Sequence, residues 1–231
     1  MAESRQQIFD NMAAVEGRLA AACRRAGRMQ TDVTLVAVTK TVSAEVAALL
    51  PNLGVHDLGE SRPQELWHKA TLVKNVRWHL IGHLQRNKIE RTLPLIARIH
   101  SVDSLRLLQA LEEACGKTGR TLPALLEVNA SREPAKHGFA PEEVLGLAPR
   151  LAELKHVHIE GLMTMAAYED KPERTRPTFS ALRTLRDRLA AELGRSLPQL
   201  SMGMSNDFEI AVEEGATLVR LGTILFEGVQ Q

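Results

Sequence analysis

Short apolar runs alternate along the chain with longer stretches in which apolar residues return at helical spacing. The first run, residues 33–41, is rich in β-branched residues and contains Lys40 near its end. Parallel strands that are buried on both faces have such continuous apolar runs, so a core strand is predicted here. A helix is predicted in front of it, because apolar residues recur at a helical period until Gly27, which suits a C-terminal cap. These positions are Ile8, Met12, Val15, Leu19, Ala22 and Ala26.

The same alternation continues to the end of the chain. Eight strands are predicted, at residues 33–41, 55–59, 77–81, 97–101, 124–129, 157–163, 199–202 and 217–221. Helices are predicted between them, at residues 43–50, 60–73 and 86–96, from Asp103, from Pro141, along a stripe from Phe179 to Leu189 that ends near Gly194, and at 207–214. Asp103 is the expected cap of its helix, and Asn206 with Glu209 has capping-box spacing.

Eight strand–helix units in roughly 200 residues are what a (β/α)8 TIM barrel needs. No linker rich in proline, glycine or serine divides the chain, so we predict one domain, residues 1–231, with an extra N-terminal helix. An open doubly wound sheet is the alternative. It is disfavoured because the first strand-to-helix turn lacks the glycine fingerprint that binds dinucleotides in that fold.

Composition narrows the choice of partners. The 231 residues are 44% hydrophobic and 25% charged, which is enough for a sizeable core. With 29 basic and 28 acidic residues the net charge is +1, so no global field would attract nucleic acid or an anionic membrane, and a small ligand is favoured. Two cysteines without metal-type spacing, no secretory segment and no long apolar run together predict a soluble cytoplasmic protein.

Lys40 is the first candidate for chemistry. It comes at the carboxyl end of a predicted core strand, where barrel enzymes keep their active sites. Burial there would lower the pKa of the amine, and such lysines form Schiff bases with aldehydes and ketones, including pyridoxal phosphate. A lysine that extends its ammonium into solvent is the alternative explanation.

Two glycine-containing stretches follow the last two strands, at residues 201–207 and 220–223. The first exposes backbone amides at a helix start, and the second offers a cation, a glycine and a hydroxyl, all suited to an anion. Barrels often bind phosphate with these two loops, although ordinary turn chemistry would explain either one alone. Together with Lys40, which the barrel places beside the last strand, they predict a phosphate-bearing aldehyde that is held covalently.

Several longer motifs carry a family resemblance. The segments VAVTKT at 36–41, GESRPQE at 59–65, WHLIGHLQRNK at 78–88 and SMGMSNDF at 201–208 resemble the signatures of the pyridoxal-phosphate homeostasis proteins. This family is similar to the N-terminal barrel of alanine racemase, and the match runs from about residue 33 to 228. Two departures are Ser61, where the family usually has asparagine, and the missing glycine after Ser131.

The resemblance implies that Lys40 holds pyridoxal 5'-phosphate as an internal aldimine and that Arg220 faces the pyridine nitrogen. It also implies that the phosphate is surrounded by Ser201, Gly203, Ser205, Gly222 and Thr223. His79, on the third predicted strand, is expected to face the cofactor ring. No metal site is predicted, because the pairs His79/His83 and His156/His158 lack a third convergent ligand.

An arginine opposite the pyridine nitrogen disfavours its protonation and makes the ring a weaker electron sink. We therefore predict a non-catalytic binder that stores pyridoxal phosphate or delivers it to apoenzymes. It is expected to be a monomer, because the dimer-building domain of alanine racemase is absent. A slow amino-acid racemase that uses Lys40 and a Schiff-base aldolase for a sugar phosphate are the alternatives. Glu60 and Glu65 are assigned to capping and a solvated helix face, and Tyr168 to a surface loop.

Overall fold

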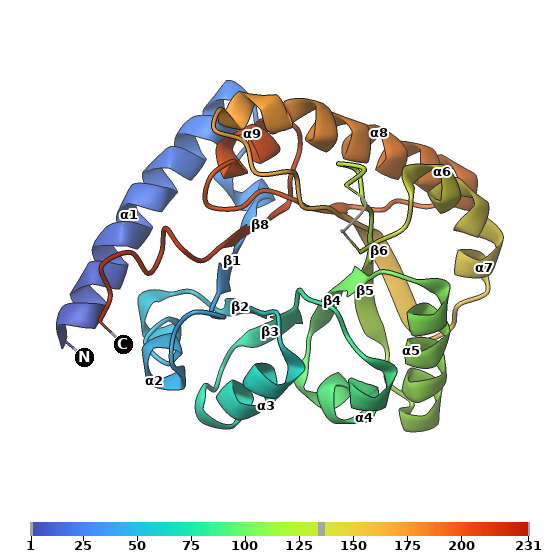
Figure 1. Ribbon diagram of the computed structural model, residues 1–231, viewed down its shortest axis with the longest axis horizontal. Coiled ribbons are helices and arrows are strands. Elements are labelled where there is room, and N and C mark those ends of the chain that lie inside the picture. The colour runs from blue at the N-terminus through green and yellow to red at the C-terminus, as the bar shows by residue number, and fades with distance from the viewer. Residues whose placement is uncertain (1, 134–136, 231) are drawn as a thin grey trace.

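Eight parallel strands close into a barrel in the computed structural model, which describes residues 2–133 and 137–230 (Figure 1). Each strand pairs with the next one in sequence, and β8 pairs with β1 through four residue pairs. The strands are β1 Thr34–Val38, β2 Asp57–Glu60, β3 Arg77–Leu80, β4 Arg98–Val102, β5 Leu122–Glu127, β6 Val157–Met163, β7 Gln199–Ser201 and β8 Leu218–Leu221. The predicted (β/α)8 fold is confirmed.

Helices surround the barrel and cover the outer faces of the strands (Figure 1). They are α1 Ala2–Arg25, α2 Ala44–Ala47, α3 Pro63–Leu72, α4 Ile89–Thr92, α5 Leu105–Thr118, α6 Pro141–Val144, α7 Ala148–Ala152, α8 Arg176–Leu193 and α9 Phe208–Glu213. Helix α8 ends at Gly194 as predicted, and both Gly194 and Gly119, which follows α5, adopt left-handed conformations. Among residues 2–133 and 137–230, none of the helices combines the length and apolarity needed to cross a bilayer.

The extra helix α1 packs against α9, the helix that precedes the last strand. Its apolar stripe, including Ile8, Val15 and Leu19, is buried as the periodicity predicts. Arg18 is paired with Glu209 on α9 through a bidentate contact of 2.7 and 2.9 Å. The predicted capping box of Asn206 and Glu209 is therefore wrong, because the Glu209 carboxylate is used between two helices and not at the start of its own.

Three local predictions differ from the structure. The helix predicted at 86–96 is one short α-helical turn flanked by 3₁₀ turns, and Pro94 lies in the second of these. Ser104, and not Asp103, caps α5, because its hydroxyl accepts a hydrogen bond from the Leu107 amide. Lys40 lies in a turn two residues beyond β1, which places its side chain at the mouth of the barrel rather than within the strand.

The core has two parts. The larger cluster fills the space between the strands and the helices, and a smaller cluster joins residues of β1, β5, β6 and β8 inside the ring. The buried members of the smaller cluster are Val36, Leu125, Met163 and Leu218. Polar side chains are also buried in the strands, and they lead to the candidate site.

Candidate cofactor site

Lys40 is exposed at the carboxyl end of the barrel, directly after the fully buried Thr39. A buried ion pair holds this turn: Nζ of Lys69 lies 2.8 Å from a carboxylate oxygen of Glu60 and donates to the Thr39 carbonyl at 2.6 Å. The Thr39 hydroxyl donates to the same carboxylate at 3.1 Å. These contacts fix the backbone that presents Lys40.

The position of Glu60 differs from the one predicted from the sequence. The sequence placed it on a solvated face at the start of a helix, yet it is the last residue of β2 and is fully buried. Lys69, on α3, is only 2% exposed and supplies the opposite charge. A carboxylate is tolerated in such a position only when it is paired and hydrogen-bonded, and Glu60 has both kinds of partner.

The loops after β1, β7 and β8 line an open cavity of about 610 Å³ at the carboxyl end of the barrel. Its lining includes Thr41 from the first loop, Ser205 and Asn206 from the second, and Thr223 and Ile224 from the third. The Ser205 hydroxyl accepts a hydrogen bond of 3.4 Å from the Ile224 amide, which ties the last two loops together. Tyr168 also lines the cavity, although 82% of it is exposed.

Two glycines let these loops approach each other. Gly203 has a φ of +92°, and a Cβ there would lie 2.6 Å from Cβ of Ala211 on α9. A Cβ at Gly222 would lie 3.0 Å from the Val38 carbonyl oxygen at the end of β1. Any larger residue would therefore push the loop after β7 away from α9, or the loop after β8 away from β1.

Arg220 lies on β8 and is 4% exposed, so its guanidinium is inside the barrel. It donates to the Ser201 hydroxyl at 2.5 Å and to the Thr164 carbonyl at 2.8 Å. Burial lowers the pKa of Arg220 to about 10, opposed by the charges of Asp207 and Glu127. The arginine remains a cation at neutral pH and is held from two sides.

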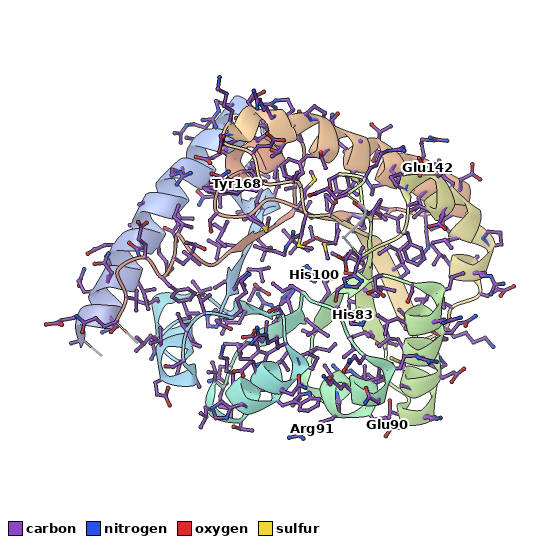
Figure 2. The ribbon with its side chains drawn as sticks, viewed as in Figure 1. His83, Glu90, Arg91, His100, Glu142 and Tyr168 are labelled. Atoms are coloured by element: carbon purple, nitrogen blue, oxygen red, sulfur yellow. The ribbon has the colours of Figure 1, made fainter. Side chains whose placement is uncertain are left out.

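A chain of buried hydrogen bonds continues from Arg220 through the barrel. Oγ of Ser201 lies 2.8 Å from Nδ1 of His100, and Nε2 of His100 lies 2.9 Å from Nδ1 of His79. Nε2 of His79 lies 2.9 Å from Oδ1 of Asp57, at the start of β2. Figure 2 shows the His100 side chain near the centre of the barrel.

The groups at the two ends of this series of hydrogen bonds determine which atom donates in each of them. A guanidinium can only donate, so the Ser201 hydroxyl accepts from Arg220 and has its one hydrogen left for Nδ1 of His100. His100 must then carry its proton on Nε2 and donate it to His79. His79 likewise donates from Nε2 to the Asp57 carboxylate, which can only accept. Both imidazoles are neutral in this arrangement.

The electrostatics agree with this assignment. Burial lowers the pKa of His79, although Asp57 acts in the opposite direction. Burial holds the pKa of His100 well below its usual value, and the positive charge of Arg220 acts in the same direction. Burial by itself would raise the pKa of Asp57, but hydrogen bonds from His79 and Arg77 outweigh it and keep that pKa below its usual range.

Two of the predicted site residues, His79 and Ser201, take part in the buried chain of hydrogen bonds. His79 uses one ring nitrogen for Asp57 and the other for His100. Ser201 is fully buried and its hydroxyl is engaged by Arg220 and His100. Gly203, Ser205, Gly222 and Thr223 do lie in the two loops at the carboxyl end, and Thr223 is exposed there.

Glu127 ends β5, which lies across the closed ring from β1 and Lys40. It is 6% exposed. Burial, together with the charge of Asp103, raises its pKa to about 7, although the charges of Arg220 and His83 act in the opposite direction. The mouth therefore contains a carboxyl group that titrates near neutral pH.

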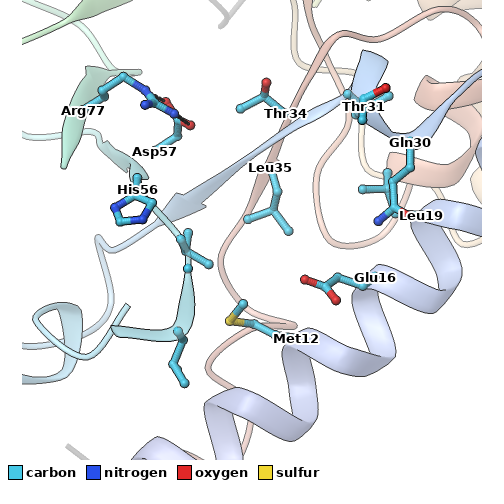
Figure 3. Close-up of a pocket in the computed structure, with 14 residues that line it drawn as sticks. Met12, Glu16, Leu19, Gln30, Thr31, Thr34, Leu35, His56, Asp57 and Arg77 are labelled. Atoms are coloured by element: carbon cyan, nitrogen blue, oxygen red, sulfur yellow. Dashed lines mark hydrogen bonds and ion pairs between the residues drawn. The ribbon is translucent and has the colours of Figure 1, made fainter. Parts of the chain in front are cut away.

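A second cavity, of about 540 Å³, lies at the other end of the barrel (Figure 3). It is bounded by Met12, Glu16 and Leu19 of α1 and by the first residues of β1, β2 and β3. The Asp57–Arg77 ion pair lies there. This cavity is separated from Lys40 by the length of the strands and is not part of the candidate site.

Sequence reasoning did not select five residues that build the site: Thr39, Asp57, Glu60, Lys69 and His100. A signal was present for some of them. Glu60 directly follows the strand predicted at residues 55–59, and His100 lies within the strand predicted at 97–101. A polar residue in a strand that is buried on both faces needs a partner, so each is evidence for a buried network. The identity of that partner depends on the pairing of distant strands.

The barrel and its lysine define the class of protein. The sequence profile of the alanine racemase N-terminal domain matches residues 11–229. An alanine racemase of Clostridium difficile 630 has the same fold, with a TM-score of 0.75 at 17% identity over 95% of this chain and 56% of the racemase.

Other relatives match along nearly the whole of both chains. A pyridoxal phosphate homeostasis protein of Aquifex aeolicus is 41% identical over 94% of this chain and 96% of its own length. The structure of PipY of Synechococcus elongatus PCC7942, with PLP bound, has a TM-score of 0.83 and 31% identity, covering 95% of this chain and 99% of PipY. The chain belongs to the family of pyridoxal phosphate homeostasis proteins.

Proposed function

We propose that this chain binds pyridoxal 5'-phosphate covalently through Lys40 and acts in intracellular homeostasis of this cofactor. One observation carries the proposal. Lys40 is exposed at the carboxyl end of the barrel, where the loops after β1, β7 and β8 line a cavity that includes Thr41, Ser205 and Thr223, and Arg220 is buried on β8. The homeostasis proteins to which the chain is similar, and PipY with PLP bound, support it.

The residues present fit the group. A phosphate ester needs backbone amides and hydroxyls with space to approach them, and the loops with Gly203 and Gly222 provide that space. Ser205 and Thr223 supply the hydroxyls in the cavity lining. Lys40 supplies the amine, and its backbone is fixed by the Lys69–Glu60 pair through Thr39.

Arg220 determines what chemistry the site favours. Pyridoxal phosphate supplies a reactive aldehyde and a ring that acts as an electron sink when its nitrogen is protonated. A cation held against that nitrogen opposes its protonation. Arg220 is held by Ser201 and Thr164, so we assign to Ser201, and to His79 through His100, the role of orienting Arg220 rather than of contacting the cofactor. Binding and release are favoured over carbanion chemistry.

The test is spectroscopic. The purified chain, incubated with pyridoxal phosphate and freed of excess, should be yellow and should retain one cofactor per chain after borohydride reduction, with the adduct on Lys40. Lys40→Ala should lose the covalent adduct. Lys74→Ala removes an exposed lysine that lies just after α3 and should behave like the wild type. A wild type without an adduct, or an adduct that persists on another lysine in Lys40→Ala, would refute the proposal.

Storage and delivery follow from the position of Lys40. Because its amine is exposed at the mouth, a second amine from solvent or from an apoenzyme can reach the linkage without a change in the barrel. We infer that the loaded protein transfers the cofactor to apoenzymes in the cytoplasm, and that it does so as a monomer. A loaded chain that does not reactivate an apoenzyme, or a stable dimer in sedimentation, would contradict these inferences.

A slow amino-acid racemase is the second candidate, and Glu127 is the observation that favours it. Racemisation needs two acid–base groups on opposite sides of the substrate. Lys40 and Glu127 follow strands on opposite sides of the ring, and the pKa of Glu127 is raised to about 7. Exchange of the α-proton of L-alanine in D2O, followed by NMR, should then require both residues. Absence of exchange in the loaded wild type would reject this candidate and leave the binder.

A further inference from the structure

Three potential metal ligands meet at the mouth of the barrel, away from the loops assigned to the cofactor. His83 follows β3, Asp103 follows β4, and His137 lies in the loop after β5. One ligand atom from each lies within 4.8 Å of the others. The cofactor loops follow β1, β7 and β8, so the two groups of residues occupy different sectors of the ring.

The three side chains are already ordered with respect to one another. Nδ1 of His83 lies 2.6 Å from Oδ2 of Asp103. The rings of His83 and His137 are stacked, with centroids 5.0 Å apart and an interplanar angle of 19°. The hydroxyl of Ser104 donates to Oδ1 of Asp103 at 3.1 Å, which orients the carboxylate and leaves Oδ2 directed at His83. Partners of this outer kind are typical of metal-binding carboxylates.

The carboxylate of this group is buried and the two imidazoles are exposed, which suits a metal site that is open to solvent. The side chain of Asp103 is 6% exposed, whereas that of His83 is 48% exposed. The carboxylate is thus anchored in the protein while both imidazoles face solvent at the mouth. A cation could enter directly, and a fourth coordination position would remain for water or another ligand.

We propose that His83, Asp103 and His137 form a binding site for a divalent transition-metal cation of the Zn²⁺ class. Two imidazoles and one carboxylate are a donor set that suits this class, and three protein ligands with one open position are typical of accessible rather than structural sites. The cation would lie between His83 and Asp103, and its affinity should fall at acid pH because an imidazole nitrogen that carries a proton cannot coordinate a metal. The proposal does not depend on the cofactor.

Neither histidine pair considered from the sequence forms this site. His79 is inside the barrel and is used by Asp57 and His100. His83 is instead joined by residues 20 and 54 positions further along the chain, because parallel strands bring the loops after β3, β4 and β5 to the same edge. The ligand set could not be read from spacing.

Calorimetric titration of the full chain with Zn²⁺, after treatment with EDTA, tests the site. We expect saturable binding of one Zn²⁺ per chain. His83→Ala, His137→Ala and Asp103→Asn should each weaken it by more than the roughly 10–100-fold that loss of an outer partner costs. His68→Ala, which removes an exposed histidine of α3, is the matched control and should bind like the wild type.

Two further measurements keep the test decisive. Zn²⁺ should raise the melting temperature of the wild type and of His68→Ala, but not that of the three ligand variants. Lys40→Ala should retain full Zn²⁺ affinity, so failure of the cofactor proposal and failure of this one are distinguishable. The absence of one-to-one binding, or equal affinity in the ligand variants and in His68→Ala, would show adventitious binding only and would overturn the proposal.

Discussion

Nδ1 of His100 lies 2.8 Å from Oγ of Ser201 in the interior of the barrel. The same oxygen accepts a hydrogen bond from Arg220, so His100 acts on the arginine through one intervening hydroxyl. His100 is fully buried and is not among the residues that line the cavity at the mouth. It is a positioning residue, and its effect should be visible in the spectrum of a bound cofactor.

Replacing His100 should therefore alter the environment of the pyridine ring without removing the covalent anchor. His100→Phe leaves the Ser201 hydroxyl without its acceptor, which costs about 1–3 kcal/mol for a buried group. We expect a shifted absorption maximum and an affinity for pyridoxal phosphate lowered about 10-fold or more. Arg220→Gln should give a larger spectral shift of the same kind. His100→Asn retains an acceptor and should restore much of the wild-type spectrum; a wild-type spectrum in His100→Phe would contradict the assignment.

The buried Lys69–Glu60 pair should contribute strongly to stability. Lys69→Met keeps the length of the side chain but leaves the Glu60 carboxylate buried without its partner, and such changes cost about 3–5 kcal/mol. Urea denaturation should show this loss. Lys74→Met, at an exposed position, should change the free energy of unfolding by less than about 0.5 kcal/mol.

A variant with both residues of this pair replaced separates the effect of the buried charges on stability from the effect of side-chain packing. Glu60→Gln with Lys69→Met removes both charges, so it should be more stable than Lys69→Met alone. Lys69→Met should also weaken cofactor binding, because the Thr39 carbonyl loses its donor beside Lys40. A single variant as stable as the wild type would show that the pair is not an essential support.

Glu127 predicts a pH dependence of stability. Its pKa is raised to about 7 in the folded chain from an ordinary value of 4.5. A group with a raised folded pKa contributes most below the unfolded value, and the contribution is lost as the pH rises through about 7. This shift in the pKa of Glu127 corresponds to a change in the free energy of unfolding on the order of 3 kcal/mol. We expect the free energy of unfolding of the wild type, relative to Glu127→Gln, to fall between pH 4.5 and pH 8.

Glu127→Gln is the baseline for the wild type, because glutamine keeps the shape of the side chain but cannot ionise. Other titrating groups change both proteins equally, so the difference in urea midpoint isolates Glu127. A difference that stays constant across this range, or that grows in favour of the wild type, would show that Glu127 is not the neutral group we assign.

Gly203 should tolerate no side chain. It has a left-handed backbone conformation, and a Cβ would lie 2.6 Å from Cβ of Ala211. Gly203→Ala should lower the free energy of unfolding by more than about 1 kcal/mol, and it should weaken cofactor binding because the loop after β7 must shift. Gly146→Ala, where nothing lies within 4 Å of the new Cβ, is the control. Equal effects of the two substitutions would contradict the close packing of this loop.

Local patterns in the sequence were sufficient for the elements and for the ring they form. Helical periodicity identified α1, and the strand predicted at residues 157–163 has the same bounds as β6. The order of strands follows from the alternation itself, since each strand–helix unit places the next strand beside the last. Lys40 and the loops after β7 and β8 could thus be assigned to one end of a barrel before any coordinates were known.

Partners between distant strands were decided only by the tertiary structure. The contact between His100 and Ser201 joins residues 101 positions apart, and its length depends on which way each side chain points inside the ring. The residues next to Glu60 in the sequence did not indicate that its carboxylate would form a buried ion pair with Lys69. Periodicity determines which element a residue belongs to. The closed ring determines which polar groups face one another, because only there does burial remove water and force each donor to find an acceptor.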